Sequence, residues 1–407
     1  MNQLVSFKKI VMKCNRASSM AFLAIILLSA ETGQAAQLLD KVSVHGFGGW
    51  GYGQTDNENQ HFLGGWDSDG NADYFNFSLN VRVELSDNIT GYLQPAFENI
   101  NGNSEANVDY VFAEWYLSDV LTIRAGKIKA PIMLLNEVHD VGTVRPFFLL
   151  PIGIYGDSTA ENYQGAGLTG VFSLGFESDW QLSYDLFGGF TDIYEEINKQ
   201  REGGNEVYRW TVDKMLGGRL FVQPPIDGLR FGVSGYTGNN QTNITTRGRN
   251  IQFDDGDVYA VGGSIEYLTD RWELRSEYLF LEKDEPTAYD DEYNATETAL
   301  GRYKTYYAEA AYRITEHWQL AARYEVLDYT DGFKIESPDY PFKESKEFTL
   351  GLNYWVRPNL VVKCSATFIQ GNNNVHPEAD AAYWQTEDKN DLEEETVLGL
   401  FGVQFSF

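Results

Sequence analysis

Hydrophobic and polar residues alternate along many short stretches of the chain. In 74–85, apolar side chains occupy every second position from Phe75 to Leu85, and mostly polar side chains fill the positions between them. The same alternation recurs in 272–280 and 318–327. Because successive side chains of a strand point to opposite faces of a sheet, this period of two predicts β-strands with one apolar and one polar face.

The connections between these stretches are predicted to be short and long in turn. Short turns rich in Asp, Asn, Gly and Pro are expected at 86–88, 117–119, 175–179, 224–228, 269–271, 315–317 and 357–359. Long connections are expected at 55–72, 99–107, 133–163, 191–211, 237–257, 283–302, 329–346 and 370–395. Seven short turns interleaved with eight long loops imply about sixteen strands. The predicted fold class is therefore all-β, a 16-stranded antiparallel transmembrane β-barrel with an inward-folded constriction loop.

Aromatic residues and the end of the chain agree with a barrel. Trp180, Trp272 and Trp318 each open a stretch directly after a short turn, where an interfacial girdle is expected. The last stretch, 396–407, alternates up to Phe407. The first and last strands must pair, because an open edge would leave backbone groups unsatisfied in lipid. A soluble sandwich is the alternative, but it would not order its loops in this way.

Residues 1–36 are predicted to be a signal peptide, which leaves 37–407 for the barrel. Basic residues precede an apolar run at 20–30, and small residues follow it. The run is shorter than the roughly 20 residues that a membrane helix needs. Only Cys364 would remain after cleavage, so no intrachain disulfide can form. The expected location is the bacterial cell outer membrane.

Charge and motifs exclude several classes of protein. Lys plus Arg number 31 against 59 Asp plus Glu, which argues against a nucleic-acid partner. The five histidines lie in no metalloprotease motif, and the glycine pattern at 46–51 is not followed by a helix, as a dinucleotide site would require. We expect no cofactor. The acidic outer loops 283–302 and 370–395 offer oxygen ligands to Ca²⁺ or Mg²⁺, although solubility alone also explains them.

Residues between the apolar positions are expected to line a lumen. The strand phase places these basic side chains there: Arg82, Arg124, Arg219, Arg230, Arg275, Arg313, Arg323 and Lys363. It places these acidic ones there: Glu84, Glu98, Glu114, Asp185, Glu266, Glu273, Glu277, Glu309 and Glu325. A charged inner wall indicates a water-filled channel for polar solutes. The alternative is that each charged side chain forms an ion pair that stabilises the wall.

The segment 133–163 differs from the other long connections because its centre, around Phe147 and Phe148, is apolar. Folding it into the barrel would bury these side chains and narrow the pore. We expect the constriction to bring Lys127, Lys129 and Arg145 close to Glu114, Glu137 and Asp140. Opposed charges there would select among solutes. The alternative is that the segment packs against a neighbouring barrel in an oligomer.

The run GKIKAPIMLLNEVHDVGTVRPFFLLPIGIY, residues 126–155, resembles a segment of the phosphate-selective porins O and P. The resemblance implies a sixteen-stranded, water-filled barrel, a homotrimer and an inward loop. Those relatives use a ladder of arginines and a lysine cluster, whereas the arginines here are interleaved with as many carboxylates. Phosphate selectivity therefore does not follow.

The sequence predicts an outer-membrane porin, and not an enzyme, that passes small hydrophilic solutes or ions by passive diffusion. Its expected partners are the lipid bilayer, lipopolysaccharide, small solutes and further copies of the chain in a homotrimer. A barrel hydrolase is the first alternative, and it would need a Ser, His and acid cluster or paired carboxylates on the rim. A structural or adhesive barrel with a plugged lumen is the second.

Overall fold

A computed structural model describes most of residues 41–407. The described residues are 41–56, 60–62, 66, 68–100, 103–156, 160–174, 179–199, 204–246, 249–283, 287–290, 296–298, 301–331, 344–371, 375–377 and 395–407. The expected signal peptide and most of the acidic loops, with their proposed Ca²⁺ or Mg²⁺ ligands, lie outside these residues. Among the described residues, no helix is both long enough and apolar enough to cross a membrane.

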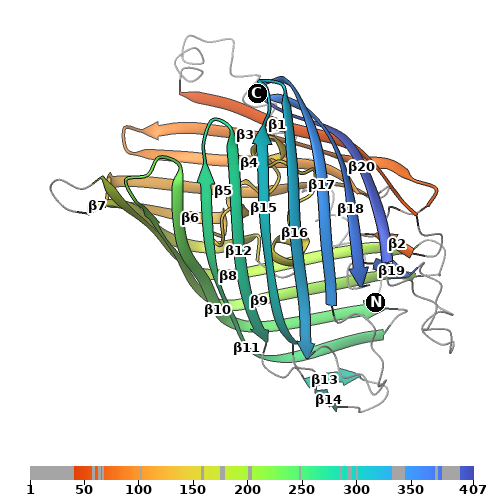
Figure 1. Cartoon of the computed structure of the whole chain (residues 1–407). Helices are drawn as coiled ribbons and strands as arrows, with labels where there is room; N and C mark the ends of the chain where they lie inside the picture. Colours follow the sequence, from red (N-terminus) through yellow and green to blue (C-terminus); the bar gives the residue numbers. More distant parts are fainter. Residues whose placement is uncertain are drawn as a thin grey trace, which may run out of the picture.

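The described strands form one closed antiparallel barrel (Figure 1). Its wall consists of β1 (Val42–Thr55), β3 (Asn71–Ser86), β4 (Ile89–Ile100), β5 (Asn103–Ser118), β6 (Leu121–Lys129), β7 (Asn162–Leu174), β8 (Trp180–Lys199), β9 (Gly204–Gln223), β10 (Leu229–Thr246), β11 (Arg249–Leu268), β12 (Trp272–Lys283), β15 (Gly301–Arg313), β16 (Trp318–Asp331), β17 (Glu344–Arg357), β18 (Leu360–Gly371) and β20 (Glu395–Ser406). β13 (Thr287–Asp290) and β14 (Thr296–Thr298) extend the sheet from β11, and β2 (Gln60–Phe62) pairs separately with β19 (Val375–Pro377). The predicted sixteen-stranded barrel is thus confirmed within the described residues.

The two ends of the wall close on each other. β1 pairs with β20 from Phe47 opposite Ser406 to Thr55 opposite Leu398. The final residue continues the ladder, because the Phe407 amide donates to the Gly46 carbonyl at 2.8 Å. Closure satisfies both edge strands, which explains why the alternation persists to the last residue.

Three connections that were expected to be long are short, and that expectation was wrong. β4 ends at Ile100 and β5 begins at Asn103. β8 and β9 are separated only by 200–203, and β10 and β11 only by 247–248. The expectation limited strands to the membrane thickness of about ten residues. Antiparallel strands satisfy each other's backbone groups, so the wall continues beyond that thickness; Val207 of β9 is opposite both Glu196 of β8 and Thr245 of β10.

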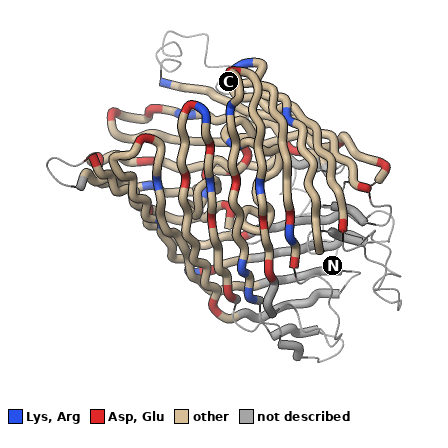
Figure 2. The backbone as a smooth tube through the Cα atoms, viewed as in Figure 1, with Lys and Arg blue, Asp and Glu red and all other residues tan. Residues whose placement is uncertain are grey.

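The alternation also fixes which face of the wall points outward. Along β17, exposed and buried residues alternate from Glu344 to Trp355. The tryptophans that open β8, β12 and β16 are exposed on the outer surface. Acidic and basic positions are distributed along the strands around the ring (Figure 2). The wall therefore has an apolar exterior and a polar, charged interior.

The segment between β6 and β7 lies inside the ring of strands (Figure 1). It spans 130–161, slightly displaced from the expected 133–163, and we call it the constriction loop. It contains two single 3-10 turns, η2 (Asn136–Val138) and η3 (Gly142–Val144), and one turn of helix, α3 (Ile152–Tyr155). Phe147 and Phe148 are almost completely buried, as their hydrophobicity predicted.

Glycines of the wall provide the space into which the loop packs. Phe148 lies over Gly51 and Gly402, a directly opposed pair on β1 and β20. A Cβ atom at Gly402 would lie 2.3 Å from the Phe148 ring, and one at Gly51 would lie 2.5 Å from it. Met133 occupies the same kind of space over Gly262 of β11. The last glycine of the 46–51 pattern therefore serves packing against the constriction loop.

Candidate constriction site

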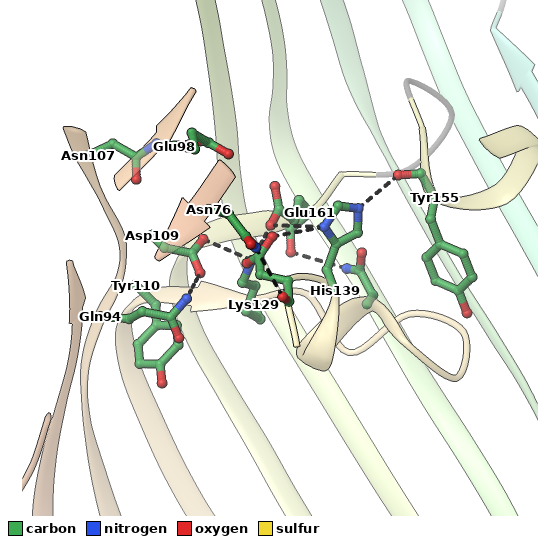
Figure 3. A network of polar contacts seen from close by, with 12 residues as sticks. Asn76, Gln94, Glu98, Asn107, Asp109, Tyr110, Lys129, His139, Tyr155 and Glu161 are labelled. Atoms are coloured by element: carbon green, nitrogen blue, oxygen red, sulfur yellow. Dashed lines mark hydrogen bonds and ion pairs between the residues drawn. The ribbon is translucent and has the colours of Figure 1, made fainter. Parts of the chain in front are cut away.

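One charged cluster lies where the constriction loop leaves β6 (Figure 3). The Lys129 ammonium is buried and forms ion pairs with Asp109 at 2.9 Å, with Asp140 at 3.0 Å and with Glu161. Gln94 donates a hydrogen bond to the other oxygen of Asp109 at 2.5 Å. Three carboxylates thus surround one ammonium.

His139 extends this cluster toward α3. Its Nδ1 lies 3.2 Å from Asp140 Oδ1, and its Nε2 lies 3.1 Å from the Tyr155 carbonyl oxygen. Both partners only accept hydrogen bonds, so only the doubly protonated imidazolium satisfies both contacts. Burial disfavours that charge, but the Asp140 hydrogen bond and the Glu161 charge outweigh it and raise the pKa of His139 above 6.5.

Asp140 stays charged in these surroundings. Burial disfavours the carboxylate, but the charge of Lys129 and the contacts with His139 outweigh it and hold the pKa of Asp140 well below its usual range. Its backbone also contacts the opposite strand, because Asn76 of β3 donates to the Asp140 carbonyl at 3.3 Å. Asp140 therefore fixes this part of the constriction loop between β3 and β6.

The ligand atoms of His139, Asp140 and Glu161 lie within 4.8 Å of one another, a spacing that suits a metal ion. The ammonium of Lys129 already contacts both carboxylates. Because this built-in cation neutralises part of their charge, we assign no metal to the cluster.

A second charged cluster lies deeper, between the loop and β5 to β9. Arg124 donates to Glu114 at 2.9 Å and contacts Glu137 of the loop at 3.7 Å. Arg219 pairs with the same Glu137 and with Asp185, at 2.9 Å for the latter. Glu137 therefore bridges an arginine of β6 and an arginine of β9.

Lys363 of β18 holds the loop through its main chain. Its ammonium donates to the carbonyls of Gly142 and Arg145 at 2.7 Å each, and to that of Phe147 at 3.1 Å. The side chain is 2% exposed. All three donors of the ammonium are used, so Lys363 fixes the position of three loop residues at once.

Arg145 turns back into the loop. It donates to the carbonyl of His139, and to that of Phe148 at 2.9 Å. Burial, the largest influence, lowers the pKa of Arg145. The sequence predicted acidic partners for Arg145, but two main-chain carbonyls accept the hydrogen bonds of its guanidinium.

Two buried carboxylates of the wall bind the loop from the other side. Glu277 accepts from the Leu134 amide at 2.7 Å and from the hydroxyls of Tyr155 and Tyr307. Glu325 accepts from the Gly153 amide at 2.6 Å. Hydrogen bonds to charged groups contribute about 1.5–3 kcal/mol each. These contacts pin both halves of the loop to β12 and β16.

The other predicted arginines have different surroundings. Arg275 is enclosed by Glu266, Glu273 and Glu309 and donates to the Val144 carbonyl. Arg323 donates to the Leu149 carbonyl and lies over the Phe147 ring. Arg313 lies over the Trp355 ring, away from the loop carbonyls. Arg82 is half exposed and pairs with Glu84 at 3.1 Å.

Lys127 does not join Lys129, although the sequence analysis placed them together. It forms no ion pair with the first cluster among the described contacts, although the charges of Asp109, Glu161 and Lys129 act on it. Its ammonium donates to the Val108 carbonyl at 2.8 Å. The structure therefore brings together Lys129 with Asp140, and Glu114 with Glu137, but in two separate clusters.

Sequence reasoning missed Asp109, Glu161 and His139 as members of the first cluster. Asp109 lies at an irregularity where Gln94 pairs with Tyr110 and Pro95 with Val108. The extra residue shifts the alternation, so simple phase counting cannot place Asp109. The only signal in the sequence was Pro95, which cannot donate to the ladder and often marks such a bulge.

Three comparisons bear on the family. A family model for phosphate-selective porin O and P matches residues 183–387. An uncharacterized protein of Aquifex aeolicus (strain VF5) is 21% identical over 328 residues, which cover 73% of this chain and 68% of that protein.

Solved structures share the fold. The trimer form of OmpT, an outer membrane protein of Vibrio cholerae, superposes with a TM-score of 0.52 at 11% identity, over 90% of this chain and 99% of its own. OmpF of Salmonella typhi, in complex with daunomycin, gives a TM-score of 0.50 at 14% identity, over 90% of this chain and 97% of its own.

Proposed function

The chain belongs to the phosphate-selective porin O and P family and is an outer-membrane porin, and we propose that its channel passes small hydrophilic solutes with a preference for cations over anions. The family name suggests phosphate, but the charges of the described lumen support the opposite preference. The proposal concerns the two charged clusters around the constriction loop.

The observation that carries the proposal is the excess of carboxylates in both clusters. Lys129 and the His139 imidazolium face Asp109, Asp140 and Glu161, so three carboxylates share two cations. In the deeper cluster, Arg124 and Arg219 share Glu114, Glu137 and Asp185. An anion would find each of these cations already paired, whereas a cation would meet a negative potential.

Exposure indicates which of these groups a passing ion meets. Asp140 and Glu161 are 26% and 36% exposed, whereas the Lys129 side chain that they contact is 6% exposed. The carboxylates are therefore more accessible than the ammonium. We propose Glu114, Glu137 and Asp140 as the groups that set selectivity. Arg124 and Arg219 position the two glutamates, and Lys129 positions Asp140.

The experiment is the reversal potential of the purified protein in a planar bilayer under a KCl gradient. We expect a potential of the sign that marks K⁺ preference, and a reduced one in Glu137→Gln. Asp270→Asn, on a short turn, is the control that leaves selectivity unchanged. A reversal potential that marks Cl⁻ preference would overturn the proposal.

We also propose a homotrimer and a purely diffusive mechanism. The trimer form of the similar Vibrio cholerae OmpT supports the first. For the second, the described contacts of His139 are Asp140, Glu161 and a backbone carbonyl, with no serine hydroxyl among them. Ohmic current without hydrolytic activity, and cross-linking that stops at three copies, are the expected results.

A further inference from the structure

The lumen has one side that the constriction loop leaves accessible. Loop residues 137–141 are half-buried, and Val144 is exposed, so this edge of the loop faces open space. On the wall of β3 to β6, Arg82 and Arg124 are 44% and 25% exposed. A solute that passes the loop therefore passes along these strands.

Three aromatic residues form a continuous strip on this wall. Tyr92 of β4 and Phe112 of β5 are directly opposite each other, with ring centroids 4.8 Å apart and planes inclined by 17°. Tyr110 continues the strip at 5.6 Å from the Phe112 ring. Phe112 also contacts the apolar core of the loop, which shows that the strip points inward.

The strip differs from several other inward aromatics, which are covered. Tyr163, Phe187 and Tyr307 are at most 2% exposed beneath the loop. Tyr92, Tyr110 and Phe112 are only half-buried. Leaving apolar surface in contact with water costs free energy, about 25 cal/mol per Å². Such surface inside a channel is explained if a solute covers it in passing.

Polar groups border the strip on both sides. Tyr110 donates to the Asn80 side chain at 3.2 Å, and Arg82 hydrogen-bonds the Tyr92 hydroxyl. The Arg82–Glu84 pair lies at one edge, and the Arg124–Glu114 pair lies at the other. Donors and acceptors are therefore available within reach of anything that lies on the rings.

We propose that Tyr92, Tyr110 and Phe112 form a subsite for pyranose sugars on the channel wall. A pyranose ring carries C–H groups on its faces and hydroxyls around its rim. Its faces fit an aromatic surface, whose π electrons attract the weakly positive C–H groups, and its rim fits paired arginines and carboxylates. This inference rests on the proposed channel function.

The charges also discriminate among solutes. Arg82 and Arg124 each contact a carboxylate, so neither offers an unpaired charge to an anionic solute. A neutral solute with many hydroxyls gains hydrogen bonds from both members of each pair without a charge to neutralise. An acyclic polyol has the hydroxyls but lacks the flat apolar face, and this difference provides the test.

The test compares glucose with sorbitol in single-channel recordings of the full-length protein. Glucose should reduce the ion current with a saturable concentration dependence, whereas sorbitol should reduce it only as bulk conductivity falls. In Tyr92→Leu, the half-blocking glucose concentration should rise roughly two- to tenfold, the range expected for one aromatic contact. Phe97→Leu removes an exposed ring from the same strand and is the matched control.

The outcomes separate the two proposals. Ohmic current with equal effects of glucose and sorbitol would overturn the sugar subsite and leave the channel intact. Absence of any ohmic current would overturn the channel itself. If Tyr92→Leu does not assemble, Glu84→Gln tests the polar border instead, and an unchanged half-blocking concentration in that variant would also contradict the subsite.

Discussion

Arginines on two regions of the barrel wall have opposite environments; we call the region β12 to β20 the covered half and the region β3 to β6 the open half. On the half formed by β12 to β20, the side chains of Arg275 and Arg323 are only 4% and 5% exposed. On the half formed by β3 to β6, those of Arg82 and Arg124 are 44% and 25% exposed. The constriction loop covers the first half and leaves the second open to solutes.

The difference shows how one polar wall can serve two purposes. Burying a charge is costly unless it gains a partner and hydrogen bonds. On the covered half, main-chain groups of the loop supply hydrogen bonds, as at Lys363, Glu277 and Glu325. On the open half, Arg82 and Arg124 pair with the strand residues Glu84 and Glu114 and remain partly exposed, although Lys129 at the end of β6 is buried against the loop. The covered half therefore holds the loop, and the open half meets the solute.

The largest expected effect comes from releasing the loop at Lys363. Lys363→Met would leave three carbonyls without their donor, at a cost of roughly 1–3 kcal/mol for each buried group. We expect the loop to move from the wall and the single-channel conductance to rise roughly twofold or more, because the constriction limits the current.

Lys346→Met is the control for this variant. Lys346 lies on the adjacent strand β17 and pairs with Glu344 at 2.8 Å, outside the loop contacts described here. Its conductance should match that of the unmodified protein. Equal conductance in Lys363→Met would show that Lys363 does not set the aperture.

A smaller effect is expected from filling the space beneath Phe148. In Gly402→Val, the new Cβ would lie 2.3 Å from the Phe148 ring. Overpacking of this kind costs typically about 1–3 kcal/mol. We expect a lower melting temperature and a broader distribution of conductance levels.

Gly399→Val lies on the same strand and provides the comparison. A Cβ at Gly399 meets no atom closer than 3.8 Å among those described. Its melting temperature and conductance should be close to those of the unmodified protein. If both valine variants behave alike, strand propensity and not loop packing explains the change.

The smallest effect concerns pH and His139. Its pKa is raised in the folded protein, so the contribution to loop stability is complete below pH 6.5 and is lost as pH rises through the raised value. Asp140, Glu161 and Lys129 face the imidazole, and Asp140 stays charged throughout. We expect the noise of the open-channel current to increase as pH rises above the raised pKa of His139, because the neutral imidazole releases one of its two contacts.

His139→Gln removes the titration and should flatten this dependence. The glutamine amide still reaches a hydrogen-bond partner but carries no charge in either condition. Noise that increases with pH equally in the variant would assign the effect to another group.

The sequence predicted the wall well and the clusters only in part. The period of two placed Arg275 and Glu277 on the inner face, because strand phase is a local property. It could not place Asp109, where a bulge shifts the phase, or predict that Lys127 donates to the Val108 carbonyl after Gly126 adopts a φ of +140°. Its family assignment is confirmed, but the matched residues 183–387 lie outside the run 126–155 that suggested it.

Alternation and terminal pairing determined the closed barrel, since each strand needs only its own side-chain pattern and a neighbour for its backbone groups. The apolar centre around Phe147 and Phe148 determined that a long connection would be buried. Only the tertiary structure decided which half of the wall that connection covers. The choice depends on contacts between residues far apart in the chain, such as Gly142 with Lys363 and Leu134 with Glu277, which a local pattern does not encode.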